Sequence, residues 1–189
     1  MGVMWVFGYG SLMWNPGFPV ADSATARLMG WHRALCIHSF HHRGTEAQPG
    51  LVLGLDRGGS CIGRVLQVEP GTEEETLAYL RARELISGVY NEVTRPARLL
   101  DGSGRTVDAL VYVARRDHCQ YAGSLDREEI LTRVQAAHGK AGPNADYVVA
   151  TADHLSGLGL VDPVLHWLRD RLAPGDTHVE DPGPGTGPG

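Results

Sequence analysis

Glu84 is the residue of this sequence best placed to act as a general base. At about 100° per residue, with Leu77 as the reference, Leu80 lies about 60° to one side and Glu84 between the two. Glu84 therefore points along the apolar stripe of a helix, near its last turn. Burial and the negative end of the helix dipole both raise the pKa of such a carboxyl, whereas Arg81 or Arg83 would lower it by pairing. A carboxylate whose pKa is raised in this way can serve as a general base near neutral pH. The alternative is an ordinary Glu–Arg pair at a helix surface.

A second chemical feature is the segment VFGYGSLMW, residues 6–14, which places two glycines and two hydroxyls between apolar residues. Gly8 and Gly10 permit either the close approach of a ligand or a positive φ. A strand end that turns there exposes successive N–H groups, which suit a small anion or an oxyanion, and Tyr9 and Ser11 add hydroxyls. The alternative is a β-bulge in a buried strand. No GK[ST] follows and the third position of G-x-G-x-x-G is Met13, so the segment is not a nucleotide-binding loop.

Two further groups of residues are weaker candidates. His38, His41 and His42 cluster, and His38 and His42 have the spacing of metal ligands on a helix. Here that spacing crosses a strand end into a loop, so we expect a structural or solvent-facing role and no metal site. Tyr147 stands at the start of a predicted helix, where it faces either the core or a cleft.

The composition describes an ordinary globular domain. The chain has 189 residues, of which 42% are hydrophobic and 21% charged, with a net charge of −5. An acidic balance argues against nucleic acid and anionic membranes as partners. Cys36, Cys61 and Cys119 are far apart and form no CxxC pair, so we expect reduced thiols in a cytoplasmic protein. Neither a signal-peptide pattern nor an apolar run of membrane-spanning length is visible.

The elements that must position these residues are strands first and helices later. We expect strands over residues 3–9 and 26–39, and a hairpin of 51–56 and 61–69 around Arg57-Gly58-Gly59-Ser60. A second hairpin joins residues 89–100 and 106–115 through Asp101-Gly102-Ser103-Gly104. This order predicts an α+β domain rather than a doubly wound sheet.

The helix that carries Glu84 begins at a capping box, in which Thr72 is followed three residues later by Glu75. It should end at about Ile86, near Gly88. Further helices are expected over residues 125–138, 144–158 and 161–172. The domain then spans residues 1–173, and residues 174–189 form a tail that is too rich in Pro and Gly to fold.

The motifs together resemble the bacterial type of the ChaC-like γ-glutamylcyclotransferases over roughly residues 4–172. The resemblance rests on WVFGYGSLMWNP, GWHRAL, HRGTEAQPG, YLRARELISGVY and GPNADYV, which occur in the order and spacing of that family. The first and the fourth motif are the specific ones. The sequence departs from the eukaryotic members, which follow the glutamate with Lys-Gly-Gly, because here LISGVY follows Glu84.

The resemblance implies a compact β-barrel-like mixed sheet with flanking helices, in an enzyme without a cofactor that cleaves glutathione to 5-oxoproline and cysteinylglycine. It makes Glu84 the catalytic acid and base and Tyr147 a substrate contact, and it marks Arg43 as a recurring arginine with no assigned role. The substrate loop that it implies consists of Val6, Phe7, Gly8, Tyr9, Gly10 and Ser11. We expect a monomer or weak dimer. Two alternatives stay open: a cyclotransferase for other γ-glutamyl dipeptides or amines, and a non-catalytic module that binds a γ-glutamyl metabolite.

Overall fold

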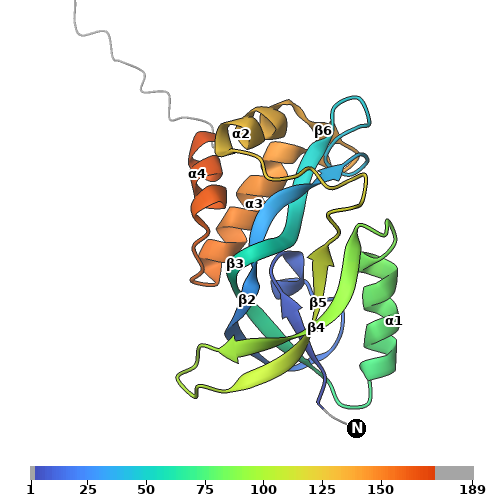
Figure 1. Cartoon of the computed structure of the whole chain (residues 1–189), viewed down its shortest axis with the longest axis vertical. Coiled ribbons are helices and arrows are strands. Elements are labelled where there is room, and N and C mark those ends of the chain that lie inside the picture. The colour runs from blue at the N-terminus through green and yellow to red at the C-terminus, as the bar shows by residue number, and fades with distance from the viewer. Residues whose placement is uncertain (1–2, 173–189) are drawn as a thin grey trace, which may run out of the picture.

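The structure, a computed structural model, describes residues 3–172 and has at its centre a closed five-stranded barrel (Figure 1). The strand order around the barrel is β1-β3-β2-β4-β5, and only the pair of β1 and β5 is parallel. The strands are β1 (Trp5–Gly8), β2 (Val20–Ser39), β3 (Gly50–Val68), β4 (Tyr90–Leu99) and β5 (Thr106–Ala114). The predicted α+β class and barrel-like sheet are confirmed. The expected tail, residues 174–189, lies outside the described residues.

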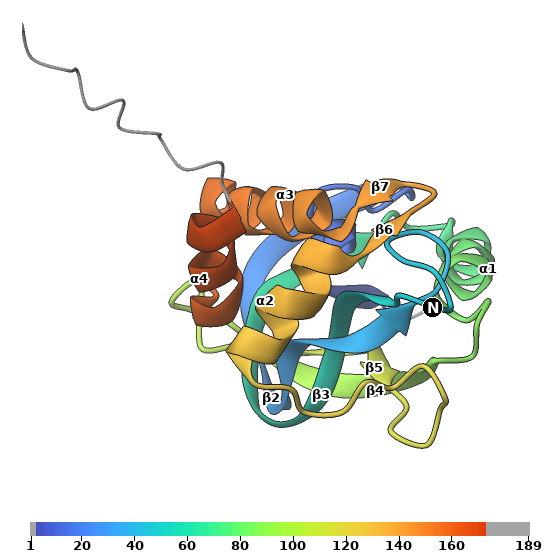
Figure 2. The same cartoon turned by 90° about the horizontal axis from the view of Figure 1, so that it is seen from above.

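Helices cover two sides of the barrel. They are the 3-10 helix η1 (Ser11–Met13), α1 (Glu73–Glu84), α2 (Arg127–Ala136), α3 (Asn144–Gly157) and α4 (Pro163–Leu172). A short hairpin of β6 (His138–Gly139) and β7 (Gly142–Pro143) connects α2 to α3. Viewed from above, α1 lies alone on one side, and α2, α3 and α4 form a layer away from it (Figure 2). No helix within residues 3–172 has the length and apolar character needed to cross a bilayer.

The predicted hairpin of residues 51–56 and 61–69 is wrong, because both segments belong to the single long strand β3. Gly58 and Gly59 have φ of 102° and 65°, but they form a bulge instead of a turn. The ladder with β2 pairs Met29 with Ser60 and then Trp31 with Arg57, so one residue of β2 faces two of β3. The strand bends there and continues along β2, which itself begins at Val20, six residues before the predicted start.

Helix α1 begins at Glu73 as predicted, but the capping box does not form. The Thr72 hydroxyl donates to the Glu69 carbonyl at 2.9 Å, and no side chain caps the helix. The helix ends at Glu84 rather than at Ile86, and Gly88, with φ of 71°, turns the chain into β4. The second hairpin, β4 with β5, and the helices α2, α3 and α4 form within the predicted segments.

The core fills the barrel and extends under the helical layer. The barrel contributes Phe7, Leu28, Leu55, Val65 and Val111, all fully buried. Residues of α2, α3 and α4 join the same cluster: Val134, Val148, Leu155 and Leu168. A second cluster packs α1 against the barrel through Leu80, Val6 and Tyr112. Since side chains alternate across a strand, β1 supplies Trp5 and Phe7 to the first cluster and Val6 to the second.

Candidate active site

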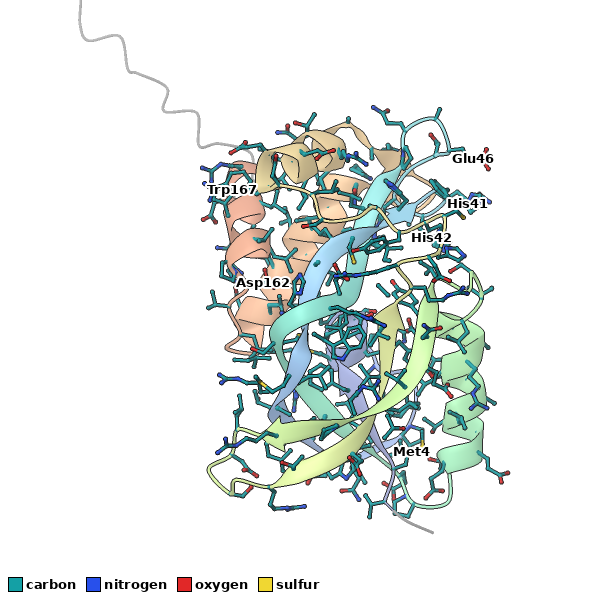
Figure 3. The ribbon with its side chains drawn as sticks, in the orientation of Figure 1. Met4, His41, His42, Glu46, Asp162 and Trp167 are labelled. Atoms are coloured by element: carbon teal, nitrogen blue, oxygen red, sulfur yellow. The ribbon has the colours of Figure 1, made fainter. Side chains whose placement is uncertain are left out.

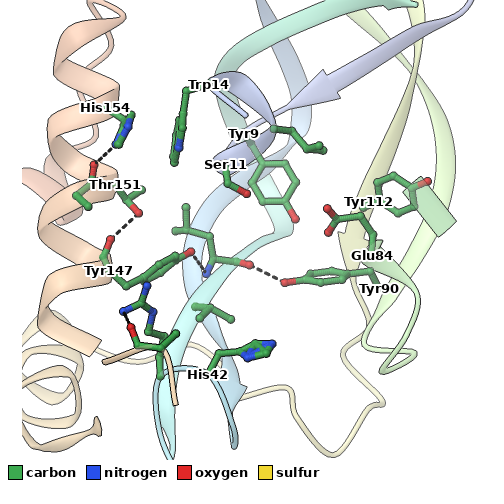
Figure 4. A pocket seen from close by; sticks show the side chains of 17 residues that line it. Tyr9, Ser11, Trp14, His42, Glu84, Tyr90, Tyr112, Tyr147, Thr151 and His154 are labelled. Atoms are coloured by element: carbon green, nitrogen blue, oxygen red, sulfur yellow. Dashed lines mark hydrogen bonds between the residues drawn. The ribbon is translucent and has the colours of Figure 1, made fainter. Parts of the chain in front are cut away.

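A cavity of about 610 Å³ lies where the end of β1, the C-terminal end of α1, strand β3 and helix α3 meet (Figure 4). Of the residues singled out from the sequence, Tyr9, Gly10, Ser11, Glu84 and Tyr147 line it together. They come from segments that are far apart in the chain. Its volume is in the range of pockets that hold small-molecule ligands.

The first part of the expected substrate loop lies beneath this cavity and does not line it. Val6 and Phe7 are fully buried in β1. Gly8 is the last residue of that strand, and a Cβ there would lie 3.1 Å from Cγ and 3.2 Å from the backbone nitrogen of Met13. Glycine is therefore needed for the close approach of η1 to the strand end, and neither Gly8 nor Gly10 has a positive φ. The strand leaves the sheet without a bulge.

The turn that follows exposes backbone donors. In η1 the carbonyl of Gly10 accepts from Met13 at 2.9 Å, and that of Ser11 accepts from Trp14 and Asn15. Within residues 3–172, no acceptor partners the N–H groups of Gly10, Ser11 or Leu12, which is expected at the start of a helix. All three residues line the cavity. Three successive N–H groups at a cavity wall suit a carboxylate or an oxyanion.

Glu84 faces inward, on the side of α1 that packs on the barrel. Thr76, Leu80 and Glu84 follow one another at four-residue spacing; the first two are buried, and the Glu84 side chain is 18% exposed. Burial raises the pKa of the Glu84 carboxyl above its usual value, and the charge of Arg83 opposes this rise. The inward orientation predicted from the helical spacing is confirmed, although the buried stripe runs through Thr76 rather than Leu77.

Arg83 joins Glu84 to the turn. Its Nε lies 3.1 Å from Oε1 of Glu84, and its Nη2 donates to the Ser11 hydroxyl at 2.8 Å. Its Nη1 donates to the carbonyls of Asn15 and Pro16 at 3.0 and 3.3 Å. Arg81, by contrast, pairs with Glu92 at 2.7 Å on an exposed face. From the sequence, Arg83 is only a possible partner of Glu84, because its contacts to the turn depend on the fold.

Tyrosines line the cavity beside the carboxylate and on the wall across from it. Tyr9, Tyr90, Tyr112 and Tyr147 all line the cavity (Figure 4). Burial raises the pKa of each phenol, and the charge of Glu84 adds to the rise, so the hydroxyls stay protonated at neutral pH. Sequence reasoning missed Tyr90 and Tyr112. The only signal for them is the strand register, which pairs Glu92 with Tyr112 and places Tyr90 on the same face of β4 as Glu92.

Two of these tyrosines bind the backbone of one residue in the barrel wall. The backbone nitrogen of Leu53 donates to the Tyr147 hydroxyl at 3.1 Å, and the Tyr90 hydroxyl donates to the Leu53 carbonyl at 2.8 Å. The ladder between β2 and β3 is irregular at this point: it pairs Ala34 with Gly54 and then Ile37 with Val52. Leu53 therefore lies opposite two residues of β2, Leu35 and Cys36, and side-chain hydroxyls bind both of its backbone groups.

The three histidines of the sequence cluster do not gather around one point. His42 lines the cavity, His38 stacks on Phe40 at 5.9 Å between ring centroids, and His41 is exposed. Figure 3 shows His41 and His42 in the loop that follows β2. Within residues 3–172, no group of three His, Cys, Asp or Glu side chains is placed to hold a metal ion.

Comparison with known proteins identifies relatives over almost the whole described chain. Residues 4–172 match the family model described as "ChaC-like protein". The glutathione-specific gamma-glutamylcyclotransferase of Escherichia coli is 39% identical over 167 residues, which are 88% of this chain and 71% of the relative. The human glutathione-specific gamma-glutamylcyclotransferase 1 is 33% identical over 158 residues, covering 82% of this chain and 71% of the relative.

Solved structures show the same fold. A crystal structure of a yeast gamma-glutamylcyclotransferase specific to glutathione superimposes with a TM-score of 0.79 at 22% identity. The match covers 91% of this chain and 96% of the yeast protein. At this level of identity the likeness concerns the arrangement of the barrel and its helices.

Proposed function

Since the chain belongs to the ChaC-like family, we propose that it is a γ-glutamylcyclotransferase that cleaves glutathione to 5-oxoproline and L-cysteinylglycine. The relatives from E. coli and human carry this activity in their names. The observation that carries the proposal to this chain is the cavity itself. Of the described residues that line it, Glu84 is the single acidic one, and it shares the cavity with three free N–H groups of the turn.

The reaction is an intramolecular displacement. The α-amino nitrogen of the γ-glutamyl group attacks the γ-carbonyl carbon, a five-membered lactam closes, and the bond from that carbon to the cysteine nitrogen breaks. Two protons leave the attacking ammonium group and two end on the departing amine, so no water is consumed. Nucleophile and electrophile belong to one molecule, and a well-oriented attack of this kind reaches effective molarities of about 10⁵ to 10⁸ M.

Glu84 moves the protons in this proposal. The substrate ammonium has no lone pair, so a base must deprotonate it before the attack. The raised pKa makes Glu84 a stronger base than an exposed carboxylate and lets it pass the proton on to the leaving nitrogen. Its position at the end of a helix packed on the barrel fixes the carboxylate before the substrate binds.

The turn binds the substrate and the charge that develops on it. The N–H groups of Gly10, Ser11 and Leu12 are suited to the α-carboxylate of the γ-glutamyl group or to the oxygen of the tetrahedral intermediate. Phenol hydroxyls of Tyr9 and Tyr147 add neutral donors. Val6, Phe7 and Gly8, which the resemblance includes in the substrate loop, support the turn from beneath.

The first experiment is the release of 5-oxoproline by the purified protein from glutathione and from γ-glutamylalanine. Release from glutathione is expected. Release from γ-glutamylalanine alone would move the substrate to other γ-glutamyl compounds, and release from neither would favour a binding module. Glu84→Gln should lose about 10²- to 10⁴-fold in kcat. The control is Glu75→Gln, an exposed carboxylate on the same helix, which should keep its activity.

The setting of the enzyme is part of the same proposal. We expect the enzyme to be a monomer or weak dimer. Cys36, Cys61 and Cys119 are free thiols, as is usual in the cytoplasm, where we place the reaction. Size-exclusion chromatography with light scattering measures the oligomeric state, and a stable higher oligomer would contradict this part.

A further inference from the structure

Arg43 lines the same cavity and has no part in the lactam chemistry. Of the described residues around the cavity it is the single arginine, and the structure includes no lysine there. Its guanidinium carbon lies 5.6 Å from the centroid of the Tyr147 ring. Figure 4 shows Tyr147 on α3, across the cavity from Glu84. The cavity thus has a permanent cation on the wall opposite its carboxylate.

The backbone that carries Arg43 packs directly against the β6–β7 hairpin. The backbone nitrogens of Lys140 and Ala141 donate to the carbonyls of His41 and His42 at 2.8 and 2.9 Å. A Cβ on Gly139 would lie 2.5 Å from the carbonyl carbon of His42, so the two segments touch directly. This packing fixes the base of the arginine side chain before any ligand arrives.

The guanidinium is anchored on one side and free on the other. Nη1 donates to the carbonyl of Ala141 at 2.6 Å and to that of Pro143 at 3.3 Å. Within residues 3–172, no acceptor partners Nε or Nη2, and no carboxylate pairs with Arg43. Nε and one N–H of Nη2 form the parallel pair of donors that matches a carboxylate.

We propose that Arg43 binds the glycine carboxylate of glutathione. The inference rests on the function proposed above and assigns its substrate specificity: the enzyme selects γ-glutamyl peptides that end in a free carboxylate at this distance. Glutathione carries an ammonium group and a carboxylate at its γ-glutamyl end. In the proposed function the ammonium lies at Glu84 and the carboxylate at the N–H groups of the turn. From its γ-carbonyl to the glycine carboxylate two residues span about 7 Å when extended. The third charge therefore has a partner of opposite sign on the far wall.

The test compares glutathione with its glycine monoethyl ester, which differs only at that carboxylate. The wild-type protein should prefer glutathione in kcat/KM by about 10- to 100-fold, the range expected for a charged hydrogen-bonded pair. Arg43→Gln should lose about that factor with glutathione and change little with the ester. Arg43→Lys, which keeps the charge without the two-pronged geometry, should fall between them. Arg133→Gln, which removes an exposed pair on α2, is the control.

The pair of substrates separates binding from a structural role. Arg43 also holds the hairpin, so each variant is checked by thermal unfolding, and a purely structural role would lower both substrates equally. Equal losses, or a wild-type protein that turns over both compounds equally well, would overturn the proposal. Calorimetric binding of both compounds to Glu84→Gln, with and without Arg43→Gln, tests the subsite without turnover. A failure of turnover alone then counts against the proposed reaction, and equal binding of the two compounds counts against the subsite.

Discussion

At the scale of single residues, the proposed role of Glu84 as a base depends on the balance between burial and one nearby charge. Burial raises the pKa of its carboxyl, and the one close cation, Arg83, only partly compensates. The same arginine holds Ser11 and the carbonyls of the turn. The guanidinium of Arg83 therefore affects both the pKa of Glu84 and the position of the turn whose N–H groups lie at the cavity.

Arg83→Gln is expected to move the acidic limb of the kcat/KM profile to higher pH. The guanidinium favours the ionised form of Glu84, so its loss raises the pKa further, and the base is then protonated over a wider range. The lost contacts to the turn should lower kcat/KM by about tenfold at the optimum. Arg83→Lys should restore much of the profile, and Arg81→Gln should leave it in place. An unmoved acidic limb in Arg83→Gln would contradict the pairing.

Glu84→Gln should also raise the melting temperature at neutral pH. The folded pKa lies above the unfolded value, so the folded state binds more protons in between, and ionised Glu84 destabilises the fold once the pH rises above the unfolded pKa. Below about pH 4 the carboxyl is protonated in both states and the difference from wild type should vanish. Differential scanning calorimetry across pH measures this gain, and a variant less stable than wild type at neutral pH would count against a burial penalty.

At the scale of elements, the sequence patterns correctly predicted the features that depend on residues close together in the chain. The helical spacing placed Glu84 inward, and the glycine-rich turn of residues 101–104 gave the hairpin of β4 and β5. The same kind of pattern predicted a turn wrongly at Gly58 and Gly59, because glycines with a positive φ occur both in turns and in bulges. Which of the two forms depends on β2, whose Trp31 pairs with Arg57. The cavity roles of Tyr90 and Tyr112 likewise depend on a strand register that no single segment encodes.

Gly8→Ala tests how β1 positions η1. The added methyl would lie 3.1 Å from Cγ of Met13 and 3.2 Å from its backbone nitrogen, so the turn must shift by a few tenths of an ångström. We expect kcat/KM to fall by about tenfold and stability by about 1 kcal/mol. In Gly157→Ala, at the end of α3, the Cβ meets nothing within 4 Å, and stability should hold or rise slightly. Full activity in Gly8→Ala would show that the turn tolerates the shift.

At the scale of the whole molecule, one buried arginine ties the barrel, the turn and the helical layer together. Arg33 of β2 donates to the Tyr9 carbonyl at 2.6 Å and to the Ile62 carbonyl at 2.9 Å, and it pairs with Asp162, just before α4, at 3.2 Å. Its side chain is 6% exposed. Tyr9, Ile62 and Asp162 lie 24, 29 and 129 residues from Arg33 in the chain, which is why the sequence alone did not single Arg33 out.

Arg33→Met should lower the free energy of unfolding by about 3 to 5 kcal/mol, because it removes the cation paired with a largely buried carboxylate and the hydrogen bonds to two carbonyls. Arg133→Gln, which removes an exposed pair, should change it by less than about 1 kcal/mol. Chemical denaturation monitored by fluorescence compares the two. Similar values for both variants would mean that the Arg33 network contributes no more than a surface pair.

The bond pattern at Leu53 bears on how substitutions of the surrounding tyrosines should be interpreted. Tyr90 and Tyr147 both bind the backbone of Leu53, so each phenol stabilises the barrel wall as well as lining the cavity. Replacing either tyrosine by phenylalanine removes the hydrogen-bond partner of the Leu53 N–H or of the Leu53 carbonyl. Slow turnover in such a variant would then follow from a distorted cavity wall, even where the phenol contacts no reacting atom. Both hydroxyls have a structural role in the barrel, whether or not they take part in the reaction.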